Sequence, residues 1–504
     1  MRSMITRAAR CGLTNSSATK LARPVWSSCQ SYRHFTATAA KRDEERKWST
    51  PLAKQLTEAI NTTGPIPLAS YMRMCLTSDT GGYYTGAIQQ GRDQFGKKGD
   101  FITSPEISQI FGELIGIWFV AEWISQGRPR SGVELMEVGP GRGTLMDDML
   151  RTIKNFPDMV SSIDAIYMVE ASPELRVAQK NLLCGEDTPL TESKIGYHST
   201  SKYANLPIVW TETIQAVPKE ASKTPFIVAH EFFDALPIHA FQVVDVPQQP
   251  ADPSKADSPS KSKANTSPLQ WREMVVAPAP PGSTHDSLGT PKLERHDGPV
   301  PEFQLAVSPS ATRHSMYVPE SSPRYKALKS TPNALIEVCP DAYLYAAEFA
   351  ARIGGSAQHP KERASGAALI LDYGPSDTIP VNSLRGIKGH KRVSPFSEPG
   401  LVDLSVDVDF MAIAEASMIA SEGIEVHGPV NQGDFLEAMG IQQRAQYLAK
   451  KVGDEAKKQE IETSCQRLVD RGPNGMGKLY KALAILPENE GRRRPTGFGG
   501  DVSA

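Results

Sequence analysis

Five short apolar runs alternate with stretches of helical character across the middle of the chain. The runs are 133–138, 165–169, 208–210, 226–229 and 367–371. Strands of this length that alternate with helices are typical of a parallel sheet covered by helices on both faces. The pattern therefore predicts an α/β fold in which a doubly wound sheet forms the core.

The chain turns tightly directly after the first of these runs. Residues 137–145 read Glu-Val-Gly-Pro-Gly-Arg-Gly-Thr-Leu, which places three glycines between a strand and a helix that begins near Thr144. Glycine adopts positive φ at little cost and lets a ligand come close to the backbone. The carboxyl ends of parallel strands are also where open α/β sheets bind their ligands. This loop is therefore the first candidate for a cofactor site.

The details of the loop distinguish between cofactors. A dinucleotide fingerprint needs Gly or Ala where Thr144 stands, and the loop does not match a phosphate-binding P-loop. Glu137 precedes the first glycine by two residues, and Glu170 follows the second strand, where a carboxylate can accept both ribose hydroxyls of an adenosine. These features favour S-adenosylmethionine over a packed turn without ligand. The predicted cofactor-binding residues are Glu137, Gly139, Gly141, Gly143, Thr144, Leu145 and Glu170.

A second polar group follows the fourth run, in the segment 228–237. His230, Glu231 and Asp234 stand there between apolar residues, at the same edge of the predicted sheet. We interpret these three residues as the candidate catalytic group. Asp372 and Tyr373 follow the fifth run, and we expect them in the same pocket wall.

The N-terminal segment has a different composition. Residues 1–40 contain basic residues and many Ser and Thr, and the first acidic residue is Asp43. This composition is typical of a mitochondrial transit peptide, with a merely unfolded tail as the alternative. We assign residues 1–45 to the transit peptide and residues 46–129 to an N-terminal helical region. In that region Ser104 is expected to cap a helix that runs to about Gln126.

The remaining boundaries follow from composition. Residues 247–300 are rich in Pro, Ser, Lys and Asp, so a disordered insertion is expected between the two parts of the catalytic domain, 130–246 and 301–487. A disordered tail is expected over residues 488–504. The net charge of −2 argues against nucleic-acid binding, and the six scattered cysteines predict neither a metal site nor disulfides. No apolar run is long enough for a membrane span.

Many blocks along the ordered chain resemble one family, the MidA-like methyltransferases, which include mitochondrial complex I assembly factors described as type II protein arginine methyltransferases. The blocks occur in the family's order and cover most of the chain outside the leader, the insertion and the tail. They are residues 99–109, 111–113, 137–145, 231–237, 371–374, 384–386, 389–391, 399–400, 403–404, 407–410 and 428–435.

The resemblance implies a class I, seven-stranded methyltransferase domain in the mitochondrial matrix. We expect the helix from Glu106 and the segment 385–409 to form a capping subdomain over the pocket. The resemblance also implies symmetric dimethylation of an arginine on a core subunit of complex I. Two departures stand out: family members usually carry Asn where this chain has His230, and the double-glutamate hairpin of the better-known arginine methyltransferases is absent. We expect Glu106, Asp403, Asp407 and Asp409 either to form an acidic lip for a basic substrate or to be solvated loop acids.

Two other functions are compatible with the same residues. A non-catalytic assembly chaperone could keep the fold and hold the cofactor as a structural ligand. A small-molecule methyltransferase would use an apolar pocket with His230 as base. A nicotinamide-dependent oxidoreductase is disfavoured by Thr144, and the sequence does not determine the oligomeric state.

Overall fold

The computed structural model describes residues 46–86, 99–246, 269–295 and 298–499. The chain divides into two compact units, residues 1–47 and 48–504, and the description below concerns the second. The predicted transit peptide, 1–45, lies outside the described residues. Within the described ranges, no helix is long and apolar enough to cross a membrane.

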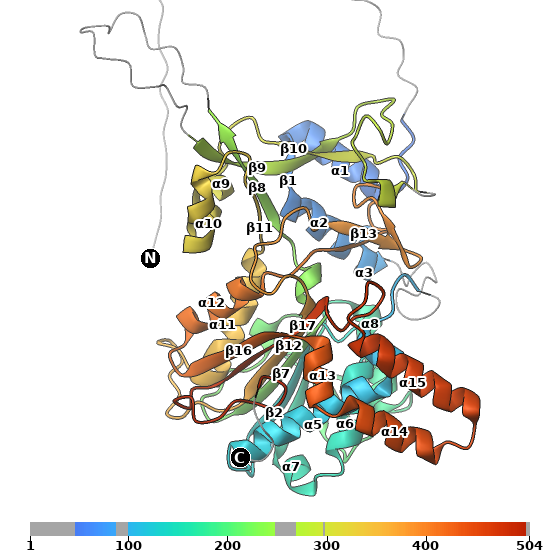
Figure 1. Ribbon diagram of the computed structural model, residues 1–504, viewed down its shortest axis with the longest axis vertical. Coiled ribbons are helices and arrows are strands. Elements are labelled where there is room, and N and C mark those ends of the chain that lie inside the picture. Colours follow the sequence, from blue (N-terminus) through green and yellow to red (C-terminus); the bar gives the residue numbers. More distant parts are fainter. Residues whose placement is uncertain (1–45, 87–98, 247–268, 296–297, 500–504) are drawn as a thin grey trace, which may run out of the picture. The chain divides into compact units, whose positions relative to one another are not determined.

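The core of this unit is a mixed sheet whose strand order is β16-β17-β12-β7-β2-β3-β6-β5-β4 (Figure 1). The five predicted runs are confirmed as neighbouring strands, and all four contacts among them are parallel. The described residues form nine strands in this sheet, and two of them, β5 and β4, lie at one edge. The strands are β2 (Val133–Val138), β3 (Ile163–Val169), β4 (Thr191–Glu192), β5 (Tyr197–Thr200), β6 (Pro207–Thr211), β7 (Thr224–His230), β12 (Ala367–Tyr373), β16 (Ile424–Asn431) and β17 (Tyr480–Pro487).

Helices cover both faces of the sheet, as the apolar runs predict, because alternate residues of a strand point to opposite faces. Leu135 belongs to a core with helices α5 and α6, whereas its neighbour Met136 packs with α11 and α12. The helices on the first face are α5 (Gln109–Ser125), α6 (Thr144–Ile153), α7 (Pro157–Ser162), α8 (Pro173–Cys184), α13 (Gln432–Ala438), α14 (Ile441–Lys451) and α15 (Glu455–Val469); on the second they are α11 (Pro340–Gly354) and α12 (Phe410–Ala420).

A separate antiparallel sheet has the order β1-β9-β8-β11, with β10 paired to β9. Helices α1 (Pro51–Thr63) and α2 (Leu68–Thr77) pack on this sheet, and the described part of the N-terminal region is helical apart from the two-residue strand β1. Its strands are β1 (Ile66–Pro67), β8 (His239–Asp245), β9 (Leu269–Pro278), β10 (Phe303–Val307) and β11 (Leu335–Val338). The short helices α9 (Arg313–Tyr317) and α10 (Pro323–Ala327) follow β10.

Strand β9 also corrects the expected disorder of residues 247–300. Residues 247–268 lie outside the described residues, but Trp271 and Val276 of β9 are buried. The Pro, Ser and Lys residues around this apolar run dominate the composition of the segment, so composition did not indicate a strand. Strand β9 has ten residues and pairs with β8 and with β10, and these partners order it.

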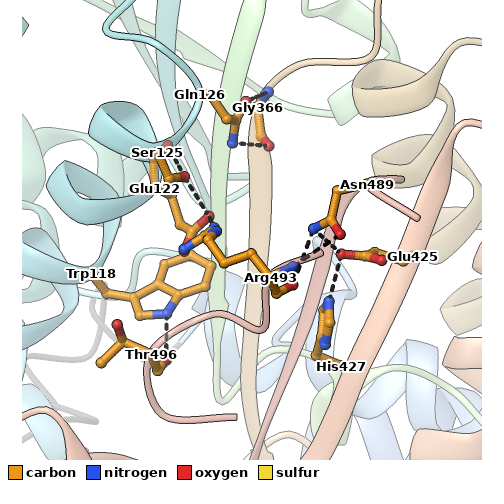
Figure 2. Close-up of polar contacts among 10 residues, drawn as sticks. All are labelled: Trp118, Glu122, Ser125, Gln126, Gly366, Glu425, His427, Asn489, Arg493 and Thr496. Atoms are coloured by element: carbon orange, nitrogen blue, oxygen red, sulfur yellow. Dashed lines mark hydrogen bonds and ion pairs between the residues drawn. The ribbon is translucent and has the colours of Figure 1, made fainter. Parts of the chain in front are cut away.

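The expected disorder of the tail is likewise wrong for residues 488–499. Arg493 forms an ion pair with the buried Glu122 of α5, and Trp118 donates a hydrogen bond to the Thr496 carbonyl over 3.1 Å (Figure 2). Asn489 donates to Glu425 of β16 over 2.8 Å. A basic run therefore orders here because a buried carboxylate needs a cationic partner.

Two smaller elements complete the fold near the site. A three-stranded sheet consists of β13 (Arg385–Lys388), β14 (Lys391–Val393) and β15 (Asp403–Ser405). The helix expected from Ser104 is interrupted, because Ser108 is the N-cap of α5 and a separate helix, α4 (Ser104–Ile107), precedes it. Thr103 rather than Ser104 is the N-cap of α4, and helix α3 (Tyr83–Gly86) lies earlier in the chain.

Candidate functional site

A cavity of about 520 Å³ lies at the carboxyl ends of β2, β3 and β7. Of the ten residues predicted for cofactor binding and catalysis, eight line it, namely Glu137, Gly139, Gly141, Thr144, Leu145, Glu170, His230 and Glu231. Gly143 and Asp234 do not line it. The parallel register explains the convergence, because equivalent strand ends meet at one edge of the sheet.

The glycine loop has left-handed backbone at all three glycines. Gly139, Gly141 and Gly143 have φ values of 69°, 53° and 83°. A Cβ on Gly139 would lie 2.5 Å from the Phe232 ring, and one on Gly143 would lie 3.2 Å from the side chain of Gln179. Gly139 and Gly143 are thus required by packing as well as by backbone conformation. Gly141 also lines the cavity, so its backbone is open to a ligand.

Two buried carboxyl groups flank this loop. Burial raises the pKa of Glu137 well above its usual range, and the nearby Glu170 raises it further. Oε2 of Glu137 is buried without a hydrogen-bond partner among the described residues. Burial likewise raises the pKa of Glu170 to about 7, although Ser172 N–H and Gln179 Nε2 donate to its carboxyl over 2.8 and 3.2 Å.

These features fit S-adenosylmethionine. An unpartnered buried acceptor at Glu137 suits the ammonium end of the cofactor, and Glu170 is the acceptor for its ribose hydroxyls. The glycine loop between them supplies backbone that a ligand can approach. The donor set and the position of the cavity therefore match the cofactor that the sequence predicts.

Gln179 on α8 is a site residue that the sequence did not reveal. Its Nε2 donates to the Gly141 carbonyl over 2.7 Å and also to Glu170, while its Oε1 accepts from the Trp210 ring over 3.0 Å. One buried amide thus connects the glycine loop to the ribose-binding acid. The sequence indicates only that Gln179 lies on the helix after Glu170, and many other residues lie there too.

Replacing Glu170 with Gln is expected to weaken cofactor binding about tenfold. The substitution replaces one carboxyl oxygen, which accepts hydrogen bonds and is charged when the acid is ionised, with an amide nitrogen that donates them. The measurement is calorimetric titration with S-adenosylmethionine. Glu212→Gln is the matched control, since Glu212 also lines the cavity but its side chain is 72% exposed. Equal affinities for both variants would remove Glu170 from the binding site.

The turn after β7 carries the candidate catalytic residues. Glu231 has a φ of 47°, which is unusual for a residue with a side chain and is held by a 2.9 Å hydrogen bond from its N–H to the Leu371 carbonyl. Burial raises the pKa of Glu231 well above its usual range, and Asp234, Glu106 and Asp403 raise it further. Ser104 N–H donates to its Oε1 over 3.4 Å and offsets this only in part.

His230 lies beside Glu231 but is not ionised at neutral pH. Burial lowers the pKa of His230 to about 3, and its ring centre is 5.0 Å from that of Phe111. His230 Nε2 lies 3.2 Å from Glu231 Oε1. Nε2 forms no hydrogen bond to the described residues.

Asp372 shapes this turn from outside the cavity. Its Oδ2 accepts the backbone N–H groups of Phe232, Phe233 and Asp234 over 3.1, 2.9 and 3.3 Å. Asp372 and Tyr373 do not line the cavity, so the expectation that they form its wall is wrong. Asp234 is turned away as well, because its carboxyl accepts the hydroxyl of Tyr373. Asp234 thus raises the pKa of Glu231 without lining the cavity.

Of the four acids expected at an acidic lip, only Glu106 lines the cavity. Asp403 is buried and accepts the Tyr84 hydroxyl over 3.1 Å. Asp407 pairs with Arg385, and Asp409 pairs with Arg324, so these two acids serve the fold. The segment 385–409 contributes no lining residue, whereas α2 and α3 contribute Arg73, Leu76, Thr77, Tyr84 and Thr85.

The buried acids predict how stability depends on pH. Burial raises the pKa of Glu134, Asp148, Glu170 and Asp403 to about 7 each. The folded chain therefore binds more protons than the unfolded chain, in which these groups titrate near pH 4, and stability must fall as pH rises. His230 acts oppositely, because burial lowers its pKa to about 3, but its contribution is complete above about pH 6.5.

The ligand-free protein is accordingly expected to lose unfolding free energy between about pH 5 and pH 8. Urea unfolding midpoints at pH 5, 6.5 and 8 would measure this trend. A midpoint that rises steadily over this range would show that the acids are ionised in the folded state at low pH.

Comparisons with known proteins agree with this geometry. Residues 114–430 match the model of a family described as S-adenosyl-L-methionine-dependent methyltransferase. Protein arginine methyltransferase NDUFAF7, mitochondrial, of Bos taurus is 33% identical over 458 residues, which cover 90% of this chain and 87% of that protein. The Homo sapiens protein of the same name is 34% identical, with coverages of 87% and 84%.

A homologue of that protein in Drosophila melanogaster is 35% identical and covers 86% of this chain and 85% of its own. The fold is similar to that of a COG1565 superfamily member from Burkholderia thailandensis, whose crystal structure is bound to S-adenosyl-homocysteine. The TM-score is 0.60 at 22% identity, over 90% of this chain and 95% of that one. The chain belongs to the MidA-like family of S-adenosyl-L-methionine-dependent methyltransferases, and S-adenosyl-L-methionine is its cofactor.

Proposed function

We propose that this chain is a type II protein arginine methyltransferase of the mitochondrial matrix. On this proposal it symmetrically dimethylates an arginine on a core subunit of complex I and so supports assembly of the complex. The names of the relatives, which are mitochondrial protein arginine methyltransferases, support the arginine and the organelle. The subunit, the symmetry of the product and the matrix location rest on the family resemblance.

The observation that carries the proposal is the state of Glu231. Burial and the neighbouring acids Asp234, Glu106 and Asp403 raise its pKa well above its usual range. A cation in the cavity reverses this effect, because an opposite charge within about 4–6 Å favours the ionised carboxylate. A guanidinium is such a cation, and it matches the two oxygens of a carboxylate. The site is therefore suited to a positively charged substrate rather than to an apolar one.

S-adenosyl-L-methionine supplies the methyl group, which leaves its sulfonium by in-line displacement. Glu231 would hold the guanidinium and concentrate its positive charge on one nitrogen, leaving electron density on the other for attack. Full deprotonation is unnecessary, and it would be costly for a group with a pKa above about 12. Glu106, at the lip of the cavity, adds to the negative potential that attracts the arginine.

His230 would act through its neutral ring. A pKa of about 3 excludes it as a proton acceptor for an arginine at neutral pH, but its unpartnered Nε2 lies in the cavity wall beside Glu231. We assign it a positioning role toward the carboxyl of Glu231. Asp234 and Asp372 hold the turn, as their hydrogen bonds indicate.

The fold also supports a class I assignment within the proposal. Without the edge strands β4 and β5, the remaining seven strands keep the order β16-β17-β12-β7-β2-β3-β6, and β17 is the strand that runs antiparallel to its neighbours. In this arrangement the first βα turn, which here is the glycine loop, holds the cofactor.

The test incubates the purified mature chain with S-adenosyl-L-methionine carrying a labelled methyl group and with isolated complex I subunits or assembly intermediates. Mass spectrometry should find dimethylarginine on one subunit, and antibodies or fragmentation should identify it as symmetric. Cofactor binding without transfer to any subunit would favour the assembly chaperone. Transfer to a quinone or lipid extract instead of protein would favour a small-molecule methyltransferase.

A further inference from the structure

A second group of polar side chains lies on the antiparallel sheet, among residues that do not line the cofactor cavity. It consists of His239 on β8, Glu273 on β9 and His314 on α9. The nitrogen and oxygen atoms that they could offer to an ion all lie within 4.8 Å of one another. Across the described ranges, no other set of three or more His, Cys, Asp or Glu side chains meets this condition.

Strand register brings the first two residues together. Phe241 of β8 lies directly opposite Glu273 of β9, and His239 precedes Phe241 by two residues. Residues two apart on a strand share one face, so His239 and Glu273 are diagonal neighbours on the same side of the sheet. Nδ1 of His239 lies 2.7 Å from Oε1 of Glu273.

The third residue comes from the start of a short helix that is fixed against the same carboxylate. Thr312 is the N-cap of α9 and accepts the N–H of Ser315 over 3.1 Å. Its hydroxyl also donates to Oε2 of Glu273. His314 is consequently held with its Nδ1 3.3 Å from Oε1 of Glu273, and its ring centre lies 4.3 Å from that of His239.

Glu273 is a carboxylate at the centre of this group. Its side chain is fully buried. Thr312 donates to Oε2, His239 Nδ1 lies 2.7 Å from Oε1, and His314 Nδ1 lies 3.3 Å from Oε1 and 3.4 Å from Oε2. Both imidazoles therefore lie against the same carboxylate, and one possible ligand atom from each of the three side chains lies within 4.8 Å of the others.

Two imidazoles and one carboxylate form a common ligand set for zinc, with the fourth position left for water. Bonds of about 2.0–2.2 Å in a tetrahedral site put ligand atoms about 3.4 Å apart. The 3.3 Å between His314 Nδ1 and Glu273 Oε1 already matches this spacing, and the 2.7 Å between His239 Nδ1 and Oε1 needs to open by about 0.7 Å. The hydrogen bond from Thr312 to Oε2 would then orient the carboxylate that binds the metal, as hydrogen-bond partners of metal ligands generally do.

We propose that His239, Glu273 and His314 form a binding site for one divalent transition metal ion, with Zn²⁺ as the ion that the ligand set favours. The site is accessible, because the side chain of His314 is 47% exposed. The ion joins α9, a helix of five residues, to strands β8 and β9. Since α9 is too short to be stable alone, the ion fixes its position on the sheet.

The experiment strips the full chain of metal with a chelator and titrates it calorimetrically with Zn²⁺ alone. We expect one ion per chain at this site and a loss of about 100-fold in affinity in His314→Ala, which removes one of three ligands. His359→Ala is the matched control, because His359 lies in the exposed loop before β12. Titration with Co²⁺ should give the visible absorption of a four-coordinate ion in the wild type and the control only.

If His314→Ala still binds S-adenosyl-L-methionine, the variant is folded. The His314 side chain is exposed, so its replacement does not disturb a buried side chain. A wild-type chain that binds no Zn²⁺, or a His314→Ala chain that binds it as tightly as the wild type, would overturn the proposal. Neither measurement involves methyl transfer, so this proposal and the arginine methyltransferase activity can fail separately.

Discussion

Glu231→Gln is expected to reduce the rate of methyl transfer at least about 100-fold, while S-adenosyl-L-methionine binds with nearly unchanged affinity. Burial and nearby acids raise the pKa of Glu231 and so favour its neutral form when no cation is bound. Gln mimics that neutral form in size and shape. It cannot ionise when a guanidinium enters, so the electrostatic stabilisation of the reacting arginine is lost. The measurements are single-turnover transfer to the protein substrate and calorimetric cofactor binding.

Glu134→Gln is the matched control for this prediction. Glu134 is also a buried acid, on β2, and burial raises its pKa to about 7, but it does not line the cofactor cavity. This variant should transfer methyl groups at the wild-type rate. If Glu231→Gln is as active as Glu134→Gln, Glu231 has no part in the reaction.

Gly141→Val is expected to weaken S-adenosyl-L-methionine binding at least about 100-fold, equivalent to ~2–3 kcal/mol of steric conflict. Gly141 lines the cavity, so a branched side chain there occupies the space in which the ligand meets the backbone. Its φ of 53° is also unfavourable for a β-branched residue. Calorimetric titration of the wild type and the variant measures the difference directly.

The strain of a left-handed valine needs its own control, and the chain provides one. Gly389 has a φ of 56°, a Cβ there would meet no atom within 4 Å, and the residue does not line the cavity. Gly389→Val therefore carries a similar backbone cost without blocking the ligand. Equal losses of binding in both variants would mean that Gly141→Val acts through folding rather than through the site.

The sequence alone determined the parallel centre of the fold and most of the candidate site. Five apolar runs predicted β2, β3, β6, β7 and β12 because strands buried on both faces must be apolar throughout. Once these strands are parallel, the residues after them meet at one edge. Glu137, Glu170 and Glu231 could therefore be assigned to one cavity before any contact was known.

Tertiary structure decided whatever depends on pairing between distant segments. Gln179 donates to the Gly141 carbonyl only because α8 packs beside the loop. Asp234 is turned from the cavity because its carboxyl accepts a hydrogen bond from the Tyr373 hydroxyl. Ordering of β9 and of residues 488–499 follows from partners far away in the sequence. His239, Glu273 and His314 likewise converge through strand register and one helix cap. Local patterns specify which residues are buried or exposed, but long-range contacts choose the partner of each polar group, and those partners fix its orientation and charge.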